Sequence, residues 1–175
     1  MTAERQERYD FSRQIASIAQ RLALLIGLAA GIFVVCRSPA ALAATTERIV
    51  VNRFSGLAIE GFDPVAYFVD SKAVMGLEDF EAWQGGVVWR FHNEGNRASF
   101  MAHPDIYGPQ FGGYDPIDVA RGVTVAGNPR LWVVTGERLF LFSREASRDA
   151  FAANPGRYVQ RAMARWQTLQ QELSR

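Results

Sequence analysis

The chain of 175 residues carries 19 Lys and Arg against 18 Asp and Glu, with a single cysteine. This length suits one globular domain with a short additional segment, and the balanced charge excludes the basic surface expected of a nucleic-acid-binding protein. A lone cysteine excludes an internal disulfide and a metal site built from several thiolates.

The first 43 residues have the organisation of an export signal. Residues 1–21 are polar, and residues 22–36 form an uncharged apolar run that is shorter than the ~20 residues needed to span a bilayer as a helix. Ala41 and Ala43 supply the small side chains of a signal peptidase site. We therefore expect residues 1–43 to be a signal peptide, cleaved after Ala43, that exports the protein to the periplasm or out of the cell.

Two alternatives stay open for this segment. An uncleaved inner-membrane anchor through residues 22–36 would make the N-terminal segment the only membrane contact of the chain. A lipid attached at Cys36 is disfavoured because Val35 stands where a small residue is expected. If cleavage occurs, the mature chain has no thiol, so a metal bound to it is not expected to be held by thiolate.

An internal repeat follows a linker or edge segment at 44–56. Residues 91–107 (FHNEGNRASFMAHPDIY) align without a gap on residues 142–158 (FSREASRDAFAANPGRY), and GFDP at 61–64 matches GYDP at 113–116. Such self-similarity indicates a duplicated structural unit. The domain is expected to cover 57–175, with a first repeat at 61–107 and a second repeat at 113–158.

Each repeat has the pattern of a β-hairpin followed by a helix, with a glycine in the turn and a proline after the helix. The expected elements are Phe80–Trp83, Val87–Phe91 and Glu94–Ala102 in the first repeat, and Leu131–Val134, Arg138–Phe142 and Glu145–Ala153 in the second. Apolar positions at helical spacing predict a last, amphipathic helix at 156–172. We therefore expect an α+β fold: two duplicated hairpin-plus-helix units, related by a pseudo-twofold rotation, around a small antiparallel sheet, with this C-terminal helix.

Several motifs resemble the bacterial YHS-domain proteins. They are FDPVAYF at 62–68, the run from Trp89 to Tyr114 that ends in YGPQFGGY, and LWVV with FLFS at 131–143. The resemblance covers nearly all of 57–169 and implies a metal- or ligand-binding role, with no settled reaction. Where similar proteins commonly read Gly-Gly-Tyr-Cys-Ala, this chain has Asp115 and Pro116 in place of the Cys-Ala pair.

Asp63 and Asp115 occupy equivalent places in the two repeats, each directly before a proline. We interpret both as helix N-caps, because Asp accepts hydrogen bonds at a helix start and Pro is tolerated at the first helical position. A ligand-facing carboxylate is the alternative. The candidate ligand-binding residues are Asp63, Tyr67, Tyr107, Gly112, Gly113, Tyr114 and Asp115. Asp63, His103 and Asp115 are candidates for a divalent metal site of hard oxygen ligands and one imidazole.

Three functions are consistent with these residues. The first is a non-catalytic extracytoplasmic binding module of the YHS type for a metal or a small ligand, in which a deep pocket would hold the candidate residues. The second is a protein-interaction or structural module without a small ligand. The third is an enzyme that uses Asp63 and Asp115 as an acid/base pair, which requires the two carboxylates to share one cleft. No nucleic-acid partner is expected.

Overall fold

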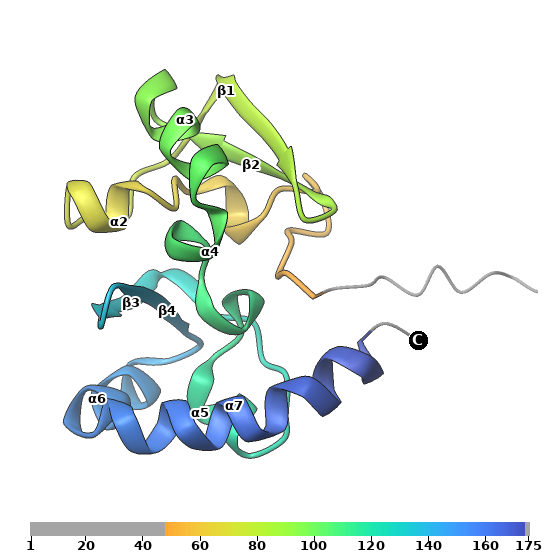
Figure 1. The fold of residues 1–175 in the computed structure, drawn as a ribbon, viewed down its shortest axis with the longest axis vertical. Coiled ribbons are helices and arrows are strands. Elements are labelled where there is room, and N and C mark those ends of the chain that lie inside the picture. The colour runs from red at the N-terminus through yellow and green to blue at the C-terminus, as the bar shows by residue number, and fades with distance from the viewer. Residues whose placement is uncertain (1–47, 174–175) are drawn as a thin grey trace, which may run out of the picture. The chain divides into compact units, whose positions relative to one another are not determined.

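The computed structural model describes residues 48–173, and the expected signal peptide lies outside them. The chain divides into units 1–42 and 43–175, and the described residues belong to the second unit. None of the helices in this part of the chain is long and apolar enough to cross a membrane. In chain order (Figure 1), the helices and strands are η1 (Ile59–Gly61), α2 (Ala66–Val69), β1 (Leu77–Gln84), β2 (Val87–Phe91), α3 (Glu94–Ala102), α4 (Pro104–Tyr107), η2 (Gln110–Gly113), α5 (Pro116–Ala120), β3 (Asn128–Thr135), β4 (Arg138–Phe142), α6 (Glu145–Ala153) and α7 (Pro155–Glu172).

The fold class is α+β, as expected, but the strands form two sheets instead of one. β1 pairs only with β2, and β3 pairs only with β4, both antiparallel. An earlier segment of the chain also forms an isolated parallel bridge with the second strand of each hairpin. Leu57 is bridged to Val88 of β2, and Pro109 is bridged to Leu139 of β4. These bridges lie on the outer edges of β2 and β4, and the two hairpins form separate two-stranded sheets in place of the single sheet that we expected.

The two hairpins share irregular features at nearly constant spacing. The register shifts between Leu77 and Glu81 in β1, and between Asn128 and Trp132 in β3. Each repeat also has an isolated antiparallel bridge between its start and the residue two before its first strand. These bridges join Phe62 to Met75 and Tyr114 to Ala126. The elements follow the same order in both repeats, from hairpin to nine-residue helix.

β4 lies between two hydrophobic clusters and contributes to both. Leu139 and Leu141 pack in a cluster with Trp89, Phe91 and Phe100 of the first repeat. The alternate β4 residues Phe140 and Phe142 pack on the other side, in a cluster with Phe111, Phe151 and Ala162. Side chains of a strand alternate between its faces, so an unbroken apolar strand can serve two cores.

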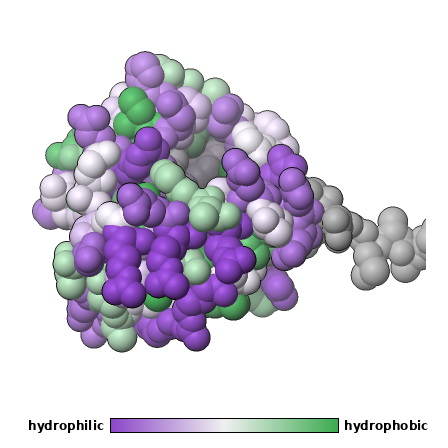
Figure 2. All heavy atoms as spheres, turned by 60° about the horizontal axis from the view of Figure 1, so that its bottom comes forward, coloured by the Kyte–Doolittle hydropathy of each residue, from purple (hydrophilic) through white to green (hydrophobic). Residues whose placement is uncertain are grey.

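α7 lies against the second cluster through one side. Ala162 and Leu169 are buried, and Trp166 between them is half-buried. Arg157, Arg161 and Arg165 are exposed. Figure 2, turned so that the α7 side of Figure 1 comes forward, shows a largely hydrophilic surface there. Long side chains with charged ends cover this face of the helix and keep their charges in water.

Candidate functional site

Asp63 is fully buried and lies before α2, whose N-cap is Val65, so Asp63 itself is not the N-cap that we expected. Its Oδ1 accepts hydrogen bonds from the backbone N–H groups of Val65 at 2.8 Å and Ala66 at 3.3 Å. Its Oδ2 accepts from the backbone N–H of His92 at 2.7 Å and from the side-chain amide of Asn96 at 2.6 Å. This carboxylate therefore ties the start of α2 to the end of β2 and to the first turn of α3.

Asp115 is the N-cap of α5 and is also fully buried, which confirms the cap interpretation. Its Oδ1 accepts from the backbone N–H of Ile117 at 2.9 Å. Its Oδ2 accepts from the backbone N–H and the hydroxyl of Ser143 at 2.9 and 2.8 Å. In both repeats one oxygen thus holds a helix start, while the other holds the residue that follows the second strand.

The helix that follows the hairpin is anchored by different side chains in the two repeats, at α3 in the first and at α6 in the second. Arg144 donates two hydrogen bonds of 3.0 Å to the buried carboxylate of Asp118, and this contact raises the pKa of Arg144. Ser147 stands where the first repeat has Asn96, and its buried hydroxyl finds no hydrogen-bond partner within the described part of the chain. The salt bridge to Asp118 therefore replaces the amide contact that Asn96 makes to Asp63.

The three candidate metal ligands lie apart from one another in the described part of the chain. Among residues 48–173, no group of three His, Cys, Asp or Glu side chains could hold a metal ion. His103 is exposed between α3 and α4, whereas Asp63 and Asp115 are each surrounded by N–H or O–H donors of their own repeat. Such donors compete with a cation for the carboxylate oxygens, and the described structure does not bring the candidates Asp63, His103 and Asp115 together as metal ligands.

The three tyrosines of the candidate list take part in packing. Tyr67 is buried, donates a hydrogen bond of 2.8 Å to the carbonyl of Pro129, and meets Trp132 edge to face. Tyr107 is half-buried, and its ring contacts Phe68 edge to face with centroids 5.3 Å apart. Tyr114 is buried, with its ring centroid 6.0 Å from that of Trp166. Aromatic pairs at these separations stabilise a core.

Gly112 and Gly113 are placed by backbone packing. The carbonyl of Gly112 accepts a hydrogen bond of 2.8 Å from Val50, and a Cβ at Gly112 would overlap the carbonyl of Arg48. Gly113 has a φ of +91°, which favours glycine. Its carbonyl accepts a hydrogen bond of 2.9 Å from Gly127. The absence of a side chain at Gly112 therefore lets residues 48–50 run close to η2.

Tyr67 gives the domain a predicted sensitivity to alkali. Burial raises the pKa of its hydroxyl well above the usual range, the Asp63 and Glu60 carboxylates raise it further, and Arg130 lowers it. The folded state therefore holds this proton more tightly than the unfolded chain. The resulting stabilisation is complete below the unfolded pKa of about 10 and is lost as the pH rises above it.

Tyr67→Phe is accordingly expected to lose less stability than the parent when the pH is raised above about 10. Near neutral pH the variant should be less stable by about 1 kcal/mol, because the hydrogen bond to Pro129 is absent. Urea unfolding of both proteins over this pH range measures the difference. Identical alkaline losses in the two proteins would contradict the prediction.

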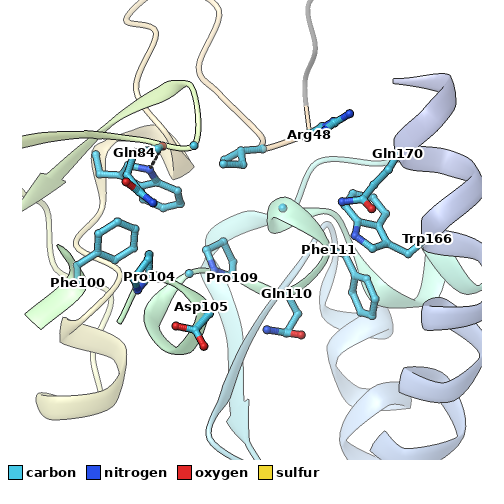
Figure 3. A pocket seen from close by; sticks show the side chains of 15 residues that line it. Arg48, Gln84, Phe100, Pro104, Asp105, Pro109, Gln110, Phe111, Trp166 and Gln170 are labelled. Atoms are coloured by element: carbon cyan, nitrogen blue, oxygen red, sulfur yellow. Dashed lines mark hydrogen bonds between the residues drawn. The ribbon is translucent and has the colours of Figure 1, made fainter. Parts of the chain in front are cut away.

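A cleft of about 650 Å³ lies elsewhere, beside the segment that joins the repeats. In Figure 3, Gln84 and Phe100 lie on one side of it, and Phe111, Trp166 and Gln170 lie on the other. Pro104, Asp105, Pro109 and Gln110 lie between the two sides, and Arg48 lies at the point where the described chain begins. Only Gly112 of the candidate ligand-binding residues lines this cleft.

On each side of the cleft, the lining residues contact one another. The indole N–H of Trp89 donates a hydrogen bond of 2.9 Å to the carbonyl of Gln84, and the rings of Trp89 and Phe100 lie 4.8 Å apart. On the other side, Phe111 meets Trp166 nearly perpendicularly at 5.8 Å. Two aromatic pairs, one from each hydrophobic cluster, therefore line the cleft.

Comparison with known proteins did not identify a family. No family of known proteins, no characterised protein and no solved structure gave a significant match to the chain. The cleft residues therefore have to be interpreted by their own chemistry. They combine apolar rings with amide groups, the Asp105 carboxylate and the Arg48 guanidinium, and a mostly apolar lining with a few polar groups is usual for a small-molecule site.

Proposed function

We propose that the protein is a non-catalytic extracytoplasmic binding module of the YHS type, and that its ligand occupies the cleft between Phe100 and Trp166. The observation that carries this proposal is the cleft itself. Its volume of about 650 Å³ falls in the range of small-molecule sites, which are mostly apolar and carry a few polar groups. A metal at the two buried aspartates is not part of this proposal.

The positions of the carboxylates disfavour an acid/base enzyme. Asp63 and Asp115 are fully buried, and both oxygens of each accept hydrogen bonds. A general acid or base must come within hydrogen-bond reach of a substrate proton, and these side chains have no exposed atom to do so. Among residues 48–173, Asp105 is the only acidic side chain that lines the cleft, so these residues place no pair of carboxylates there.

A second candidate is a protein-interaction module, which two exposed aromatic residues favour. Phe54 is fully exposed and Trp83 is 68% exposed. They lie on neighbouring segments, because Val88 pairs with Trp83 and is bridged to Leu57. Self-association through this surface should be lost when Phe54 and Trp83 are both replaced by serine. If the parent protein sediments as a monomer at all concentrations, self-association through this surface is excluded.

The expected export and the resemblance support the extracytoplasmic part of the proposal. We propose that residues 1–43 are removed as a signal peptide, since the apolar run at 22–36 is followed by small residues at Ala41 and Ala43. The alternative is retention as an inner-membrane anchor. N-terminal sequencing of the protein from its host distinguishes them, and intact residues 1–43 in the membrane fraction would exclude cleavage.

We also propose that the two repeats arose by duplication and are related by a pseudo-twofold rotation. The shared register shifts and bridges support this relation, as does the common role of Asp63 and Asp115. Equivalent positions should then respond alike to substitution. A large loss of stability for Gly127→Ala combined with no loss for Gly76→Ala would contradict the proposal.

Ligand screening tests the proposed function. A small molecule that binds the cleft should raise the thermal midpoint, because binding to the folded state alone stabilises it by RT ln(1 + [L]/Kd). Trp166→Ala should abolish that rise, and Trp83→Ala, at an exposed position that does not line the cleft, should retain it. Trp166→Leu keeps an apolar side chain and serves if the alanine variant does not fold. A ligand whose effect survives every Trp166 substitution would place the site elsewhere.

A further inference from the structure

Asp105 is the one acidic side chain among the described residues that line the cleft. It lies in the first turn of α4, its side chain is exposed, and no hydrogen bond or ion pair joins it to another described residue. In Figure 3 its carboxylate lies between Phe100 on one side and Phe111 on the other. An unpaired carboxylate at the edge of an apolar cleft attracts a cation more strongly than a neutral group.

The aromatic walls favour the same kind of ligand. Trp89 and Phe100 form one pair at 4.8 Å, and Phe111 and Trp166 form the other at 5.8 Å. Trp89, Phe100 and Phe111 are nearly fully buried and form the apolar base of the cleft, whereas Trp166 is half-buried and has ring surface left to offer. A ring face attracts an ammonium group within about 6 Å, and Trp does so best. The remaining polar groups of the cleft include the amides of Gln84, Gln110 and Gln170. These are uncharged and do not oppose a cation.

Of the described residues that line the cleft, Arg48 is the one with a cationic side chain. It is exposed and already has an interaction partner. In Figure 3 it lies across the cleft from Asp105. Repulsion from a guanidinium at an exposed rim is weakened by water. An ammonium placed beside Asp105 is therefore attracted by the nearer charge, and Arg48 lowers this preference without reversing it.

We propose that the cleft binds a small organic cation, with its ammonium group beside Asp105 and its apolar or aromatic body between the two aromatic pairs. This inference rests on the proposed binding function and names the class of ligand. Cation–π contacts at partly exposed sites and an exposed ion pair each contribute modestly, so we expect a preference for the cation over an uncharged molecule of the same shape of about 5- to 10-fold.

Three probes of similar shape test this inference with the protein recovered from its host. They are phenethylamine as the cation, phenethyl alcohol as the neutral analogue and 3-phenylpropionate as the anion. Titrations followed by tryptophan fluorescence give the three dissociation constants. The cation should bind tightest and the anion weakest.

Charge-removing variants then identify the group responsible. Asp105→Asn should reduce the preference for the cation over the alcohol to about 2-fold or less, and Arg48→Gln should leave it unchanged or increase it. Asp79→Asn removes an exposed carboxylate outside the cleft and is the matched control. Equal binding of all probes, or a preference that Asp105→Asn does not alter, overturns the cation assignment while the cleft remains a binding site. Failure of every probe to bind overturns the binding function as well.

Discussion

Asp63→Ala and Asp115→Ala are each expected to lower the free energy of unfolding by about 3–5 kcal/mol, because each substitution strands several buried donors. At Asp63 these donors are the N–H groups of Val65, Ala66 and His92 and the amide of Asn96. A buried donor without an acceptor loses its water without compensation, and each such group costs about 1–3 kcal/mol.

The asparagine variants separate this network from a simple helix cap. A cap needs only one accepting oxygen, so Asn would replace Asp with little loss. Here the second oxygen also accepts hydrogen bonds, at Asp115 from the backbone N–H and the hydroxyl of Ser143. An asparagine NH₂ would face the Ser143 N–H as a second donor, so Asp115→Asn should cost about 1–3 kcal/mol.

Urea unfolding of these variants measures both effects. Asp79→Ala, at an exposed position of β1, is the control and should change stability by less than about 0.5 kcal/mol. Replacement of Ser143 by Ala should cost less than Asp115→Ala, because the backbone N–H still reaches the carboxylate. Asp115→Ala and Asp63→Ala proteins as stable as the parent would show that the buried network does not stabilise the fold.

The local part of this network could be predicted from the sequence, and the long-range part could not. Asp before Pro predicts a helix start because both preferences act within a few residues, and Asp115 caps α5 accordingly. The other oxygen meets Ser143, which is 28 residues away in the chain. The repeat gave one signal of this contact, since His92 and Ser143 stand at equivalent places after the second strands.

The same difference between local and long-range contacts explains why the hairpins could be predicted from the sequence, whereas the two separate sheets and the cleft could not. Hairpin positions such as Val87–Phe91 and Arg138–Phe142 follow from alternation and turn residues, and the structure has them at these bounds. Their separation into two sheets, with bridges from Leu57 and Pro109 on the edges of β2 and β4, depends on contacts between segments that are distant in the chain. The cleft combines residues as distant as Arg48 and Gln170. Phe100 and Trp166 resembled ordinary core residues because aromatic spacing does not reveal which ring also borders a cavity.

Gly76→Ala and Gly127→Ala are expected to destabilise the domain by about 3 kcal/mol each, near the upper end for overpacking. A Cβ at Gly76 would lie 2.5 Å from the carbonyl carbon of Arg90, and one at Gly127 would lie 2.7 Å from the carbonyl oxygen of Gly113. Backbone atoms cannot rotate away as a flexible side chain can. The segment that carries the glycine, directly before β1 or β3, would therefore have to move away from β2 or β4.

Gly156→Ala is the matched control for these variants, since it adds the same methyl group where no atom lies within 4 Å. Gly156 lies in the first turn of α7, so alanine should leave stability unchanged or raise it by up to about 1 kcal/mol. Thermal and urea unfolding of the three variants compare a methyl group in contact with backbone with one in open space. Because Gly76 and Gly127 bond through their N–H groups to Gly61 and Gly113 at 2.9 Å, displacement of either strand would also weaken that bond. If Gly76→Ala and Gly127→Ala lower the free energy of unfolding no more than Gly156→Ala does, the segments before β1 and β3 shift freely. The close contact of these glycines with the backbone would then contribute little to the stability of the fold.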